Sequence, residues 1–397
     1  MRGGLMDVAA ELWPGSQVVP AQTAADDRPV HARFAVLRRN GAPHMLVPAE
    51  PSRAAAESIR RISAASSLRE QATRSAVSAL VRRAPVLLRE QVEVRGGAGG
   101  LVDHLGELLG TQVSVSVSVG SARVNRKPVL QVFDAQGRSL AFAKIGWSAH
   151  TNADVAAEGQ ALRTLSGHDF RHLAHPAVLA QSSWLDHLVL VIEPLRPRPL
   201  VGAGHRWSPP LEAMEELAWL GAAGPGASGV EEGPLDRAPW WRRQWVQVGR
   251  LPDPVFRARM GRVLSRIEAA HGGRNVVCGA WHGDWTPWNM AAGRGGRVLV
   301  WDWERFETGV PVGLEPLHYA LSAAHPGGPP SSAGLLRTLE WAAEADMRGA
   351  SDPHLRELLY LVAVLVRYLS LTGVPGGEHI APRAAVTLLA LEELAAA

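Results

Sequence analysis

The sequence predicts an α+β chain in which a strand-rich lobe is followed by a helical lobe. Valines alternate with serines from Val113 to Val119, which is the period-two pattern of a strand. From residue 331 to the end, the pattern is helical instead. With 397 residues, 46% of them hydrophobic, the chain is long enough for two or three lobes with buried cores. We expect an N-terminal extension over 1–100, a strand-rich lobe over 101–195 and a helical lobe over 196–397.

The N-terminal extension is predicted to be a hairpin followed by helix. Residues 1–30 are punctuated by Pro and Gly and are expected to form a loose lead-in. The dipeptide Asn40-Gly41 lies between two apolar segments and favours the positive φ angles of a tight hairpin turn. Residues 53–92 are rich in Ala, Arg, Leu and Glu and predict one or two helices. An addition to the lobe, a dimer contact and a partner-binding module all fit this segment.

The strand-rich lobe is predicted to hold three successive strands, a helix and a further strand. After Val113–Val119, the apolar segments Val129–Asp134 and Leu140–Ile145 predict the second and third strands. Residues 152–166 predict a helix, with Asn152 as its N-cap. The strongly apolar segment His187–Ile192 predicts the last strand of the lobe.

The helical lobe is predicted to contain two further short strands. Gly- and Pro-rich loops are expected over 196–210 and 221–239, and apolar strands at Val276–Cys278 and Val298–Trp301. The apolar stretch Leu355–Leu371 carries three charged residues, and a membrane span needs about 20 residues with few charges. We therefore interpret it as a buried helix.

Composition argues against several classes of protein. The net charge is only +3 and the arginines are scattered, whereas a nucleic-acid interface needs a concentrated basic patch. The single cysteine, Cys278, excludes a disulfide framework within the chain and is expected to be an inert buried thiol. No signal-peptide pattern opens the chain. We expect a soluble, cytoplasmic protein without a nucleic-acid or membrane partner, and its oligomeric state stays open.

The segment His282-Gly283-Asp284 is the first that could carry chemistry, because Asn289 follows the aspartate by five positions. Phosphoryl transfer needs a carboxylate that orients an attacking hydroxyl and accepts its proton, together with oxygen ligands for magnesium. Asp284 and Asn289 would supply these groups, at the spacing of the protein-kinase catalytic loop. The alternative is that Asp284 is a turn aspartate that bonds its own backbone.

Two further segments strengthen the phosphoryl-transfer interpretation. An apolar strand ends at Asp302, where a carboxylate could be the main magnesium ligand. Lys144, one of only two lysines among 41 basic residues, lies inside another apolar strand and needs a counter-charge there. Glu158 on the following helix could supply it, and the alternative is that Lys144 extends to solvent from an edge strand. The second lysine, Lys127, is expected at the surface.

Together these motifs resemble the aminoglycoside phosphotransferase and choline kinase-like family over about residues 112–395. The resemblance implies a bilobal protein-kinase-like fold, ATP with Mg²⁺, and phosphorylation of a hydroxyl on a small molecule. It would make Asp284 the catalytic base, with His282 bracing its loop, and Asn289 and Asp302 the metal ligands. The nucleotide would be bound by Lys144 with Glu158, and by the backbone from Ile192 to Leu195, which includes Glu193. Apart from the resemblance, Ser121, Asn125 or Lys127 could bind phosphate in the loop that follows Val119.

The sequence also departs from the family pattern. No Gly-x-Gly-x-x-Gly loop is present, and the nearest candidate, around Ser121, has one glycine. Where the family usually has Gly-Asp-Pro and then an aspartate, Gly309-Val310-Pro311 is followed by Glu315. The alternative function is a non-catalytic nucleotide-binding regulatory protein of the same fold. The acceptor stays open among sugars, amino alcohols, aminoglycoside-like molecules and natural products.

The tryptophans near the motif are expected to be mostly core residues. A second interpretation is an aromatic wall for a sugar or a cationic substrate. The residues concerned are Trp281, Trp285, Trp288, Trp301 and Trp303.

Overall fold

The chain divides into two compact units, which are described separately. A computed structural model describes residues 4–22, 27–39, 41–60, 68–84, 88–97, 100–119, 127–198, 208–220, 231–328, 331–374 and 376–397. The sheet unit comprises the described residues of Met1–Ser121, Asn125–Arg163 and Pro176–Ala203. The helical unit comprises those of Ala122–Val124, Thr164–His175 and Gly204–Ala397.

The sheet unit is built on one antiparallel sheet of nine strands, in the order β1-β4-β2-β3-β5-β6-β7-β10-β9. Strands from residues 1–100 thus extend the sheet that the later strands form, because β3 pairs with β5. The strands are β1 (Gln17–Pro20), β2 (Val30–Arg39), β3 (Ala42–Pro48), β4 (Gln91–Arg95), β5 (Ser114–Val119), β6 (Pro128–Phe133), β7 (Ser139–Ile145), β9 (Val178–Trp184) and β10 (His187–Ile192).

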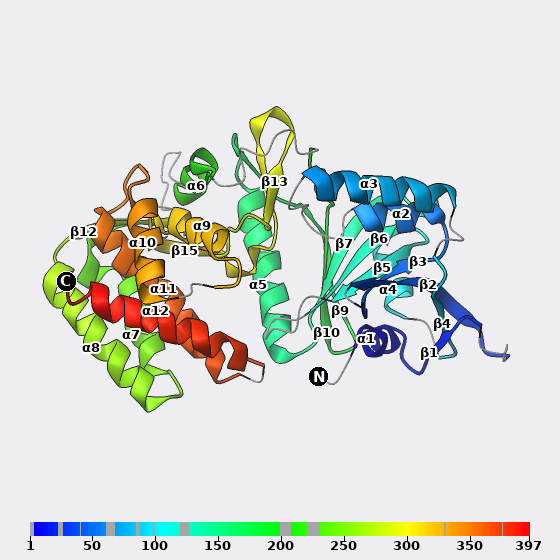
Figure 1. Cartoon of the computed structure of the whole chain (residues 1–397), viewed down its shortest axis with the longest axis horizontal. Helices are drawn as coiled ribbons and strands as arrows, with labels where there is room; N and C mark the ends of the chain where they lie inside the picture. The colour runs from blue at the N-terminus through cyan, green and yellow to red at the C-terminus, as the bar shows by residue number, and fades with distance from the viewer. Residues whose placement is uncertain are drawn as a thin grey trace. The chain divides into compact units, whose positions relative to one another are not determined.

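Helices cover both faces of this sheet (Figure 1). Because side chains alternate along a strand, Leu46 packs in the cluster under α1 and α4, whereas its neighbours Met45 and Val47 pack under α2 and α3. The helices are α1 (Leu5–Leu12), α2 (Ser52–Arg60), α3 (Leu68–Arg83), α4 (Leu101–Leu109) and α5 (Ala149–Ser166), the last belonging to this unit as far as Arg163.

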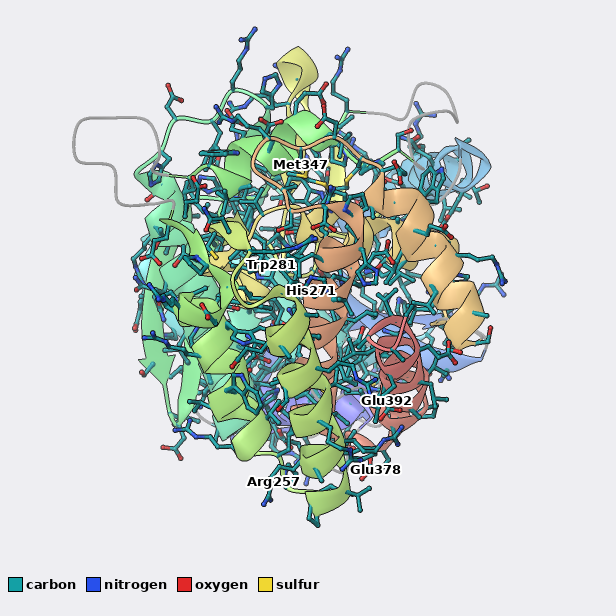
Figure 2. All side chains as sticks on the ribbon, turned by 90° about the vertical axis from the view of Figure 1, so that its left-hand side faces the viewer. Arg257, His271, Trp281, Met347, Glu378 and Glu392 are labelled. Atoms are coloured by element: carbon teal, nitrogen blue, oxygen red, sulfur yellow. The ribbon has the colours of Figure 1, made fainter. Side chains whose placement is uncertain are left out.

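The helical unit holds one large apolar core and two small sheets, β11-β12-β15 and β13-β14-β8. Helix α11 supplies much of the core, with Leu355 through Val366 buried. Figure 2 shows α8 running from Arg257 near its start to His271 at its end. The helices are α6 (Leu211–Ala218), α7 (Pro239–Gly249), α8 (Pro254–His271), α9 (Leu314–Ala324), α10 (Ser332–Ala343), α11 (Pro353–Thr372) and α12 (Ala381–Leu394).

The helical unit also contains short strands and single turns. The strands are β8 (Leu173–Ala174), β11 (Glu231–Pro234), β12 (Asn275–Trp281), β13 (Met290–Ala292), β14 (Val298–Val300) and β15 (Glu307–Pro311). Single 3-10 turns lie at Leu235–Arg237, Arg294–Gly296, Trp303–Arg305 and Glu378–Ile380.

The α+β class, the hairpin β2–β3, the strands β5, β6, β7 and β10, and the C-terminal helices are as predicted. Two predictions near the N-terminus are wrong. The lead-in over 1–30 contains α1 and β1, and the helical range predicted over 53–92 is too long, because α3 ends at Arg83 and strand β4 begins at Gln91. The packing of α1 against the sheet explains the first error, since eight residues of helix depend on tertiary contacts more than on propensity.

The predicted start of α5 is also wrong. The helix begins at Ala149, three residues before Asn152, and Ser148 caps it by accepting the Thr151 N–H at 3.2 Å. Asn152 instead accepts the Leu188 N–H at 2.9 Å and donates to the Asp186 carbonyl at 3.1 Å. Its side chain therefore joins the helix to the β9–β10 turn.

Within the part of the chain that the structure describes, no helix combines the length and apolarity needed to cross a membrane. Helix α11 is buried in the core, as predicted for the apolar stretch Leu355–Leu371.

Candidate active site

The segment from His282 to Asn289 is a loop that leaves the central strand of one small sheet and enters the other. It begins where β12 ends at Trp281 and stops where β13 begins at Met290. The backbone turns tightly, because the Asn289 N–H donates to the Thr286 carbonyl at 3.0 Å. The loop is therefore anchored at both ends by strands of the helical unit.

Glu315, in the first turn of α9, holds the backbone of this loop. Its Oε2 accepts the N–H groups of His282 and Gly283 at 2.6 and 3.1 Å, and its Oε1 accepts that of Trp285 at 3.2 Å. The carboxylate is buried, and a buried carboxylate needs such donors. Glu315 thus fixes the backbone of the loop.

His282 is fully buried and braces the loop from inside. Its Nδ1 accepts the Asp284 N–H at 3.2 Å, so its Nε2 carries the proton and donates to the Trp301 carbonyl at 3.2 Å. Burial lowers the pKa of His282, although the carboxylates of Glu315, Asp284 and Asp302 act in the opposite direction. A neutral imidazole with two fixed hydrogen bonds acts as a structural support.

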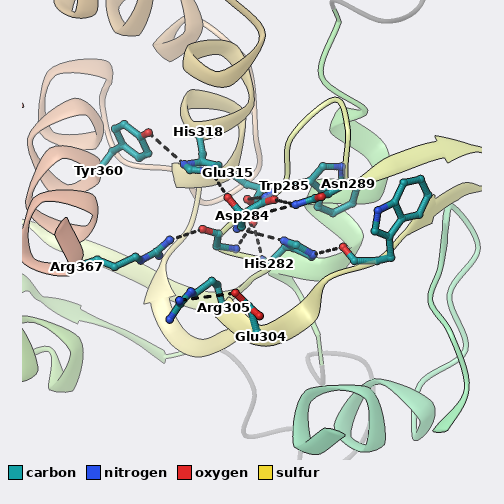
Figure 3. A network of polar contacts seen from close by, with 12 residues as sticks. His282, Asp284, Trp285, Asn289, Glu304, Arg305, Glu315, His318, Tyr360 and Arg367 are labelled. Atoms are coloured by element: carbon teal, nitrogen blue, oxygen red, sulfur yellow. Dashed lines mark hydrogen bonds and ion pairs between the residues drawn. The ribbon is translucent and has the colours of Figure 1, made fainter. Parts of the chain in front are cut away.

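The Asp284 carboxylate receives one hydrogen bond on each oxygen (Figure 3). Asn289 donates its Nδ2 to Oδ2 at 3.0 Å, and His318 Nε2 lies 3.2 Å from Oδ1. The Asp284 side chain is still 38% exposed, so solvent-side lone pairs remain accessible. Asp284 is therefore an oriented and accessible carboxylate.

Asn289 and Asp302 are brought together by the β13–β14 hairpin. Met290 pairs with Val300, and the Trp301 N–H donates to the Asn289 carbonyl at 3.1 Å. Asp302 follows directly, in the left-handed conformation at φ 73°. The two residues thus flank the same end of the hairpin.

The donor chemistry of this pair fits magnesium. Asn289 Nδ2 is engaged by the backbone and side chain of Asp284, both at 3.0 Å, which directs its side-chain oxygen away from them. A carboxylate and an amide oxygen are hard ligands of the kind that Mg²⁺ uses together with phosphate and water. No cluster of three or more His, Cys, Asp or Glu able to hold a metal occurs within the described ranges.

Arg367 of α11 secures the loop from the side of the core. Its Nη1 donates to the Gly283 carbonyl at 2.6 Å, and the guanidinium carbon lies 5.3 Å from the centre of the Trp281 ring. Gly283 has φ 76°, and a Cβ there would lie 2.5 Å from the Arg305 carbonyl oxygen. Only glycine fits this position without displacing the backbone.

In the sheet unit, Lys144 and Glu158 form the ion pair that the sequence predicted. Lys144 lies on β7, between β6 and β10, and its Nζ is 2.6 Å from Glu158 Oε1 on α5. Both side chains are buried, at 9% and 0% exposure. The alternative of an edge-strand lysine that reaches solvent is therefore wrong.

The remaining nucleotide candidates differ in what the structure shows. Ser121 and Asn125 lie outside the described residues. Glu193 is exposed, and its N–H continues the β9–β10 pairing by donating to Ala177 at 2.8 Å. Leu195, two residues on, is half-buried. Lys127 is buried at 7% exposure, so the prediction of a surface lysine is wrong.

The tryptophans divide between core and surface. Trp281, Trp285 and Trp303 are buried, as expected, whereas Trp288 is 42% exposed. Cys278 is buried, and desolvation raises its pKa to about 12, which keeps the thiol protonated and unreactive.

Three residues that contact the loop were not predicted as site residues: Glu315, His318 and Arg367. Each lies 30 or more positions from the residue it contacts. Glu315 had a signal, since it stands near the place where the family has an aspartate. His318 and Arg367 had none, because only tertiary packing brings them to the loop.

No protein-family model matches the sequence, and no curated protein matches it. Several solved structures are similar. A thermostable mutant of the aminoglycoside phosphotransferase APH(4)-Ia shares 17% identity, with a TM-score of 0.49 over 74% of this chain and 98% of that one. The macrolide 2'-phosphotransferase MphH from Brachybacterium faecium shares 15%, with a TM-score of 0.42 over 72% and 97%.

A choline kinase from Cryptosporidium parvum Iowa II is also similar, at 13% identity and a TM-score of 0.41, over 71% of this chain and 90% of that one. These are kinds of phosphotransferase that the motif resembles. At such identities a likeness concerns the fold, so the function has to be argued from the site residues.

Proposed function

We propose that this protein is an ATP-dependent phosphotransferase that phosphorylates a hydroxyl group of a small molecule. The observation that carries the proposal is the arrangement of Asp284, Asn289 and Asp302. An accessible carboxylate is fixed on both oxygens, beside a hairpin end that presents an amide and a carboxylate as hard ligands. Phosphoryl transfer depends mainly on such positioning and on charge stabilisation.

In this reaction Asp284 would orient the acceptor hydroxyl and take its proton as the oxygen bonds to the γ-phosphorus. The carboxylate is held on a loop that Glu315 and Arg367 fix through its backbone, so it loses little freedom when substrate binds. Asn289 would serve twice, by orienting Asp284 through its amide nitrogen and by offering its side-chain oxygen as a ligand.

Mg²⁺, when bound by Asn289 and Asp302, would neutralise charge on the phosphates of ATP. Lys144 would contact the α- and β-phosphates, with Glu158 fixing its ammonium group. The backbone of Glu193 and Leu195, directly after β10, would bind the adenine. Both assignments come from the family resemblance and are consistent with the ion pair and with the partial exposure of this segment.

Binding and turnover measurements test the proposal in two steps. Thermal unfolding with and without Mg-ATP measures nucleotide binding, and ADP release over a panel of sugars, amino alcohols and aminoglycosides measures transfer. We expect stabilisation by Mg-ATP, and ADP release that one class of acceptor increases. Stabilisation without ADP release would favour the non-catalytic nucleotide-binding protein. No response to Mg-ATP in either assay would contradict both.

A further inference from the structure

His318 contacts the Asp284 side chain and is itself held by a tyrosine. It lies on α9 one turn after Glu315, so both residues project from one face of the helix toward the loop. Glu315 binds the backbone of the loop, and His318 Nε2 lies 3.2 Å from Asp284 Oδ1. On its other side, His318 Nδ1 lies 3.3 Å from the Tyr360 hydroxyl of α11. Figure 3 shows the three side chains in a row.

The Asp284 carboxylate and the Tyr360 hydroxyl together indicate which nitrogen of His318 carries the proton. Tyr360 is buried at 2% exposure, and desolvation raises its pKa well above the usual value, so the phenol keeps its proton. A carboxylate only accepts, so the hydrogen bond to Asp284 requires a proton on Nε2, and the phenol can then donate to Nδ1. Nε2 therefore donates to the carboxylate.

This arrangement has a consequence for the geometry of Asp284. With His318 on Oδ1 and Asn289 on Oδ2, rotation of the carboxylate about its Cβ–Cγ bond would break two hydrogen bonds. His318 is only 6% exposed, so packing restrains the donor as well. A base that is held in one orientation has less freedom to lose in the transition state.

We propose that His318 is a positioning residue for Asp284, and that Tyr360 holds it in the tautomer with the proton on Nε2. The role rests on the proposed phosphotransferase function. No proton passes to His318: the acceptor proton goes to Asp284, and His318 keeps its own. Tyr360 acts only through His318.

The tautomer can be measured independently of activity. ¹⁵N NMR of the full chain, labelled at histidine, distinguishes the two neutral tautomers and the doubly protonated ring, and the spectrum of His318→Gln assigns the signal. We expect a proton on Nε2 and a hydrogen-bonded acceptor at Nδ1. We expect Tyr360→Phe to change the Nδ1 shift. A ring protonated on Nδ1 would overturn the proposal, as would a doubly protonated ring.

Kinetics of two matched variants test the positioning role. His318→Leu removes the donor at similar volume, whereas His318→Gln keeps an N–H donor near the position of Nε2. Turnover of Mg-ATP is measured with the best acceptor from the panel, or with water if none is found, and the Kd of Mg-ATP is measured by calorimetry. We expect His318→Leu to lower kcat by about ten- to a hundredfold with the Kd within about twofold, and His318→Gln to recover most of the loss.

Each other outcome has a definite meaning. Unchanged kcat in His318→Leu would overturn the positioning role. Equal losses in both variants would also overturn it, because they would show that the N–H donor has no effect, and weaker Mg-ATP binding beside them would point to a merely structural residue. If the wild-type chain neither bound nor turned over Mg-ATP, the proposed function would fail and the positioning role with it. The NMR spectrum would then still decide whether the hydrogen-bonded row exists.

Discussion

At the scale of single residues, the Lys144–Glu158 pair shows most clearly what burial demands. Both charged groups lie among apolar strands and helix residues, and Glu158 has no exposure at all. Each charge is tolerated there because the other is 2.6 Å away. Removal of one partner would leave an uncompensated buried charge.

We therefore expect Lys144→Met to lower the free energy of unfolding of the sheet unit by about 3–5 kcal/mol. The double variant Lys144→Met/Glu158→Leu should recover much of this loss, since it removes the unpaired charge. Urea denaturation of the two variants and the wild type measures the difference. Equal stability of wild type and Lys144→Met would show that the pair is not coupled in the folded protein.

A second residue-scale prediction concerns Gly283. Its φ of 76° and the 2.5 Å approach of a Cβ to the Arg305 carbonyl oppose any side chain at this position. Gly295 in the β13–β14 turn has a similar φ of 66°, but a Cβ there meets nothing within 4 Å. Gly283→Ala and Gly295→Ala therefore share the backbone strain and differ in the clash.

We expect Gly295→Ala to cost about 1 kcal/mol of stability and to leave turnover nearly unchanged. Gly283→Ala should cost about 2 kcal/mol or more and should displace the loop, so that turnover falls at least tenfold. Thermal unfolding and ADP release measure both effects. Similar behaviour of the two variants would mean that Arg305 moves away and the loop keeps its place.

At the scale of elements, the start of α9 organises the loop. Glu315 accepts three backbone N–H groups from the loop, and Glu216 of α6 accepts three from Arg171, His172 and Leu173. The two glutamates thus do the same structural task at different places. A carboxylate in the first turn of a helix is also favoured by the helix dipole.

This pair allows loop geometry to be separated from stability. Replacement by Gln puts an amide N–H where the backbone needs an acceptor, so each variant should lose about 2 kcal/mol. We expect Glu315→Gln to lower kcat strongly, and Glu216→Gln to leave it close to that of the wild type. Denaturation midpoints and ADP release give the two readouts. If the two variants lost activity equally, instability would explain the loss and α9 would have no particular role.

Elements could be predicted where their signal is local. The valine alternation of β5 and the apolar strand around Lys144 depend on near neighbours, and the structure has both. The spacing of five positions from Asp284 to Asn289 is local in the same way. The helix α1 was missed because long-range packing decides it. The cap of α5 was missed because Ser148, four residues before the predicted cap Asn152, caps the helix instead.

At the scale of the whole molecule, the N-terminal hundred residues form part of a continuous nine-stranded sheet. The sequence predicted strands and helices there but not their union with the later strands, because pairing of β3 with β5 joins residues about seventy positions apart. His318 and Arg367 were not predicted for the same reason, because each contacts a loop residue that is distant in the sequence. The motif could be found from spacings in the sequence, whereas the residues that hold it in place come together only in the folded chain.

The pH dependence of stability is another property of the whole molecule. Desolvation of Glu357 on α11 raises its pKa from 4.5 to about 7, Glu340 and Glu344 add to the rise, and Arg356 opposes it. The folded protein thus binds this proton more tightly than the unfolded chain does. Stability from this group is complete below pH 4.5 and is lost as the pH rises toward about 7.

We expect Glu357→Gln to be more stable than the wild type at about pH 8 and equal to it at about pH 4. The exposed Glu378 provides the control, and Glu378→Gln should match the wild type at both values. Denaturation midpoints measure the difference. A variant that was less stable than the wild type at the higher pH would contradict the assigned direction.

The measurement that tests the central claim most directly is phosphoryl transfer by Asp284→Asn. The substitution keeps the size of the side chain and removes the carboxylate that would accept the proton. We predict that ADP release falls by about a thousandfold or more while the Kd of Mg-ATP stays within about twofold. Transfer at the wild-type rate by Asp284→Asn would contradict the account.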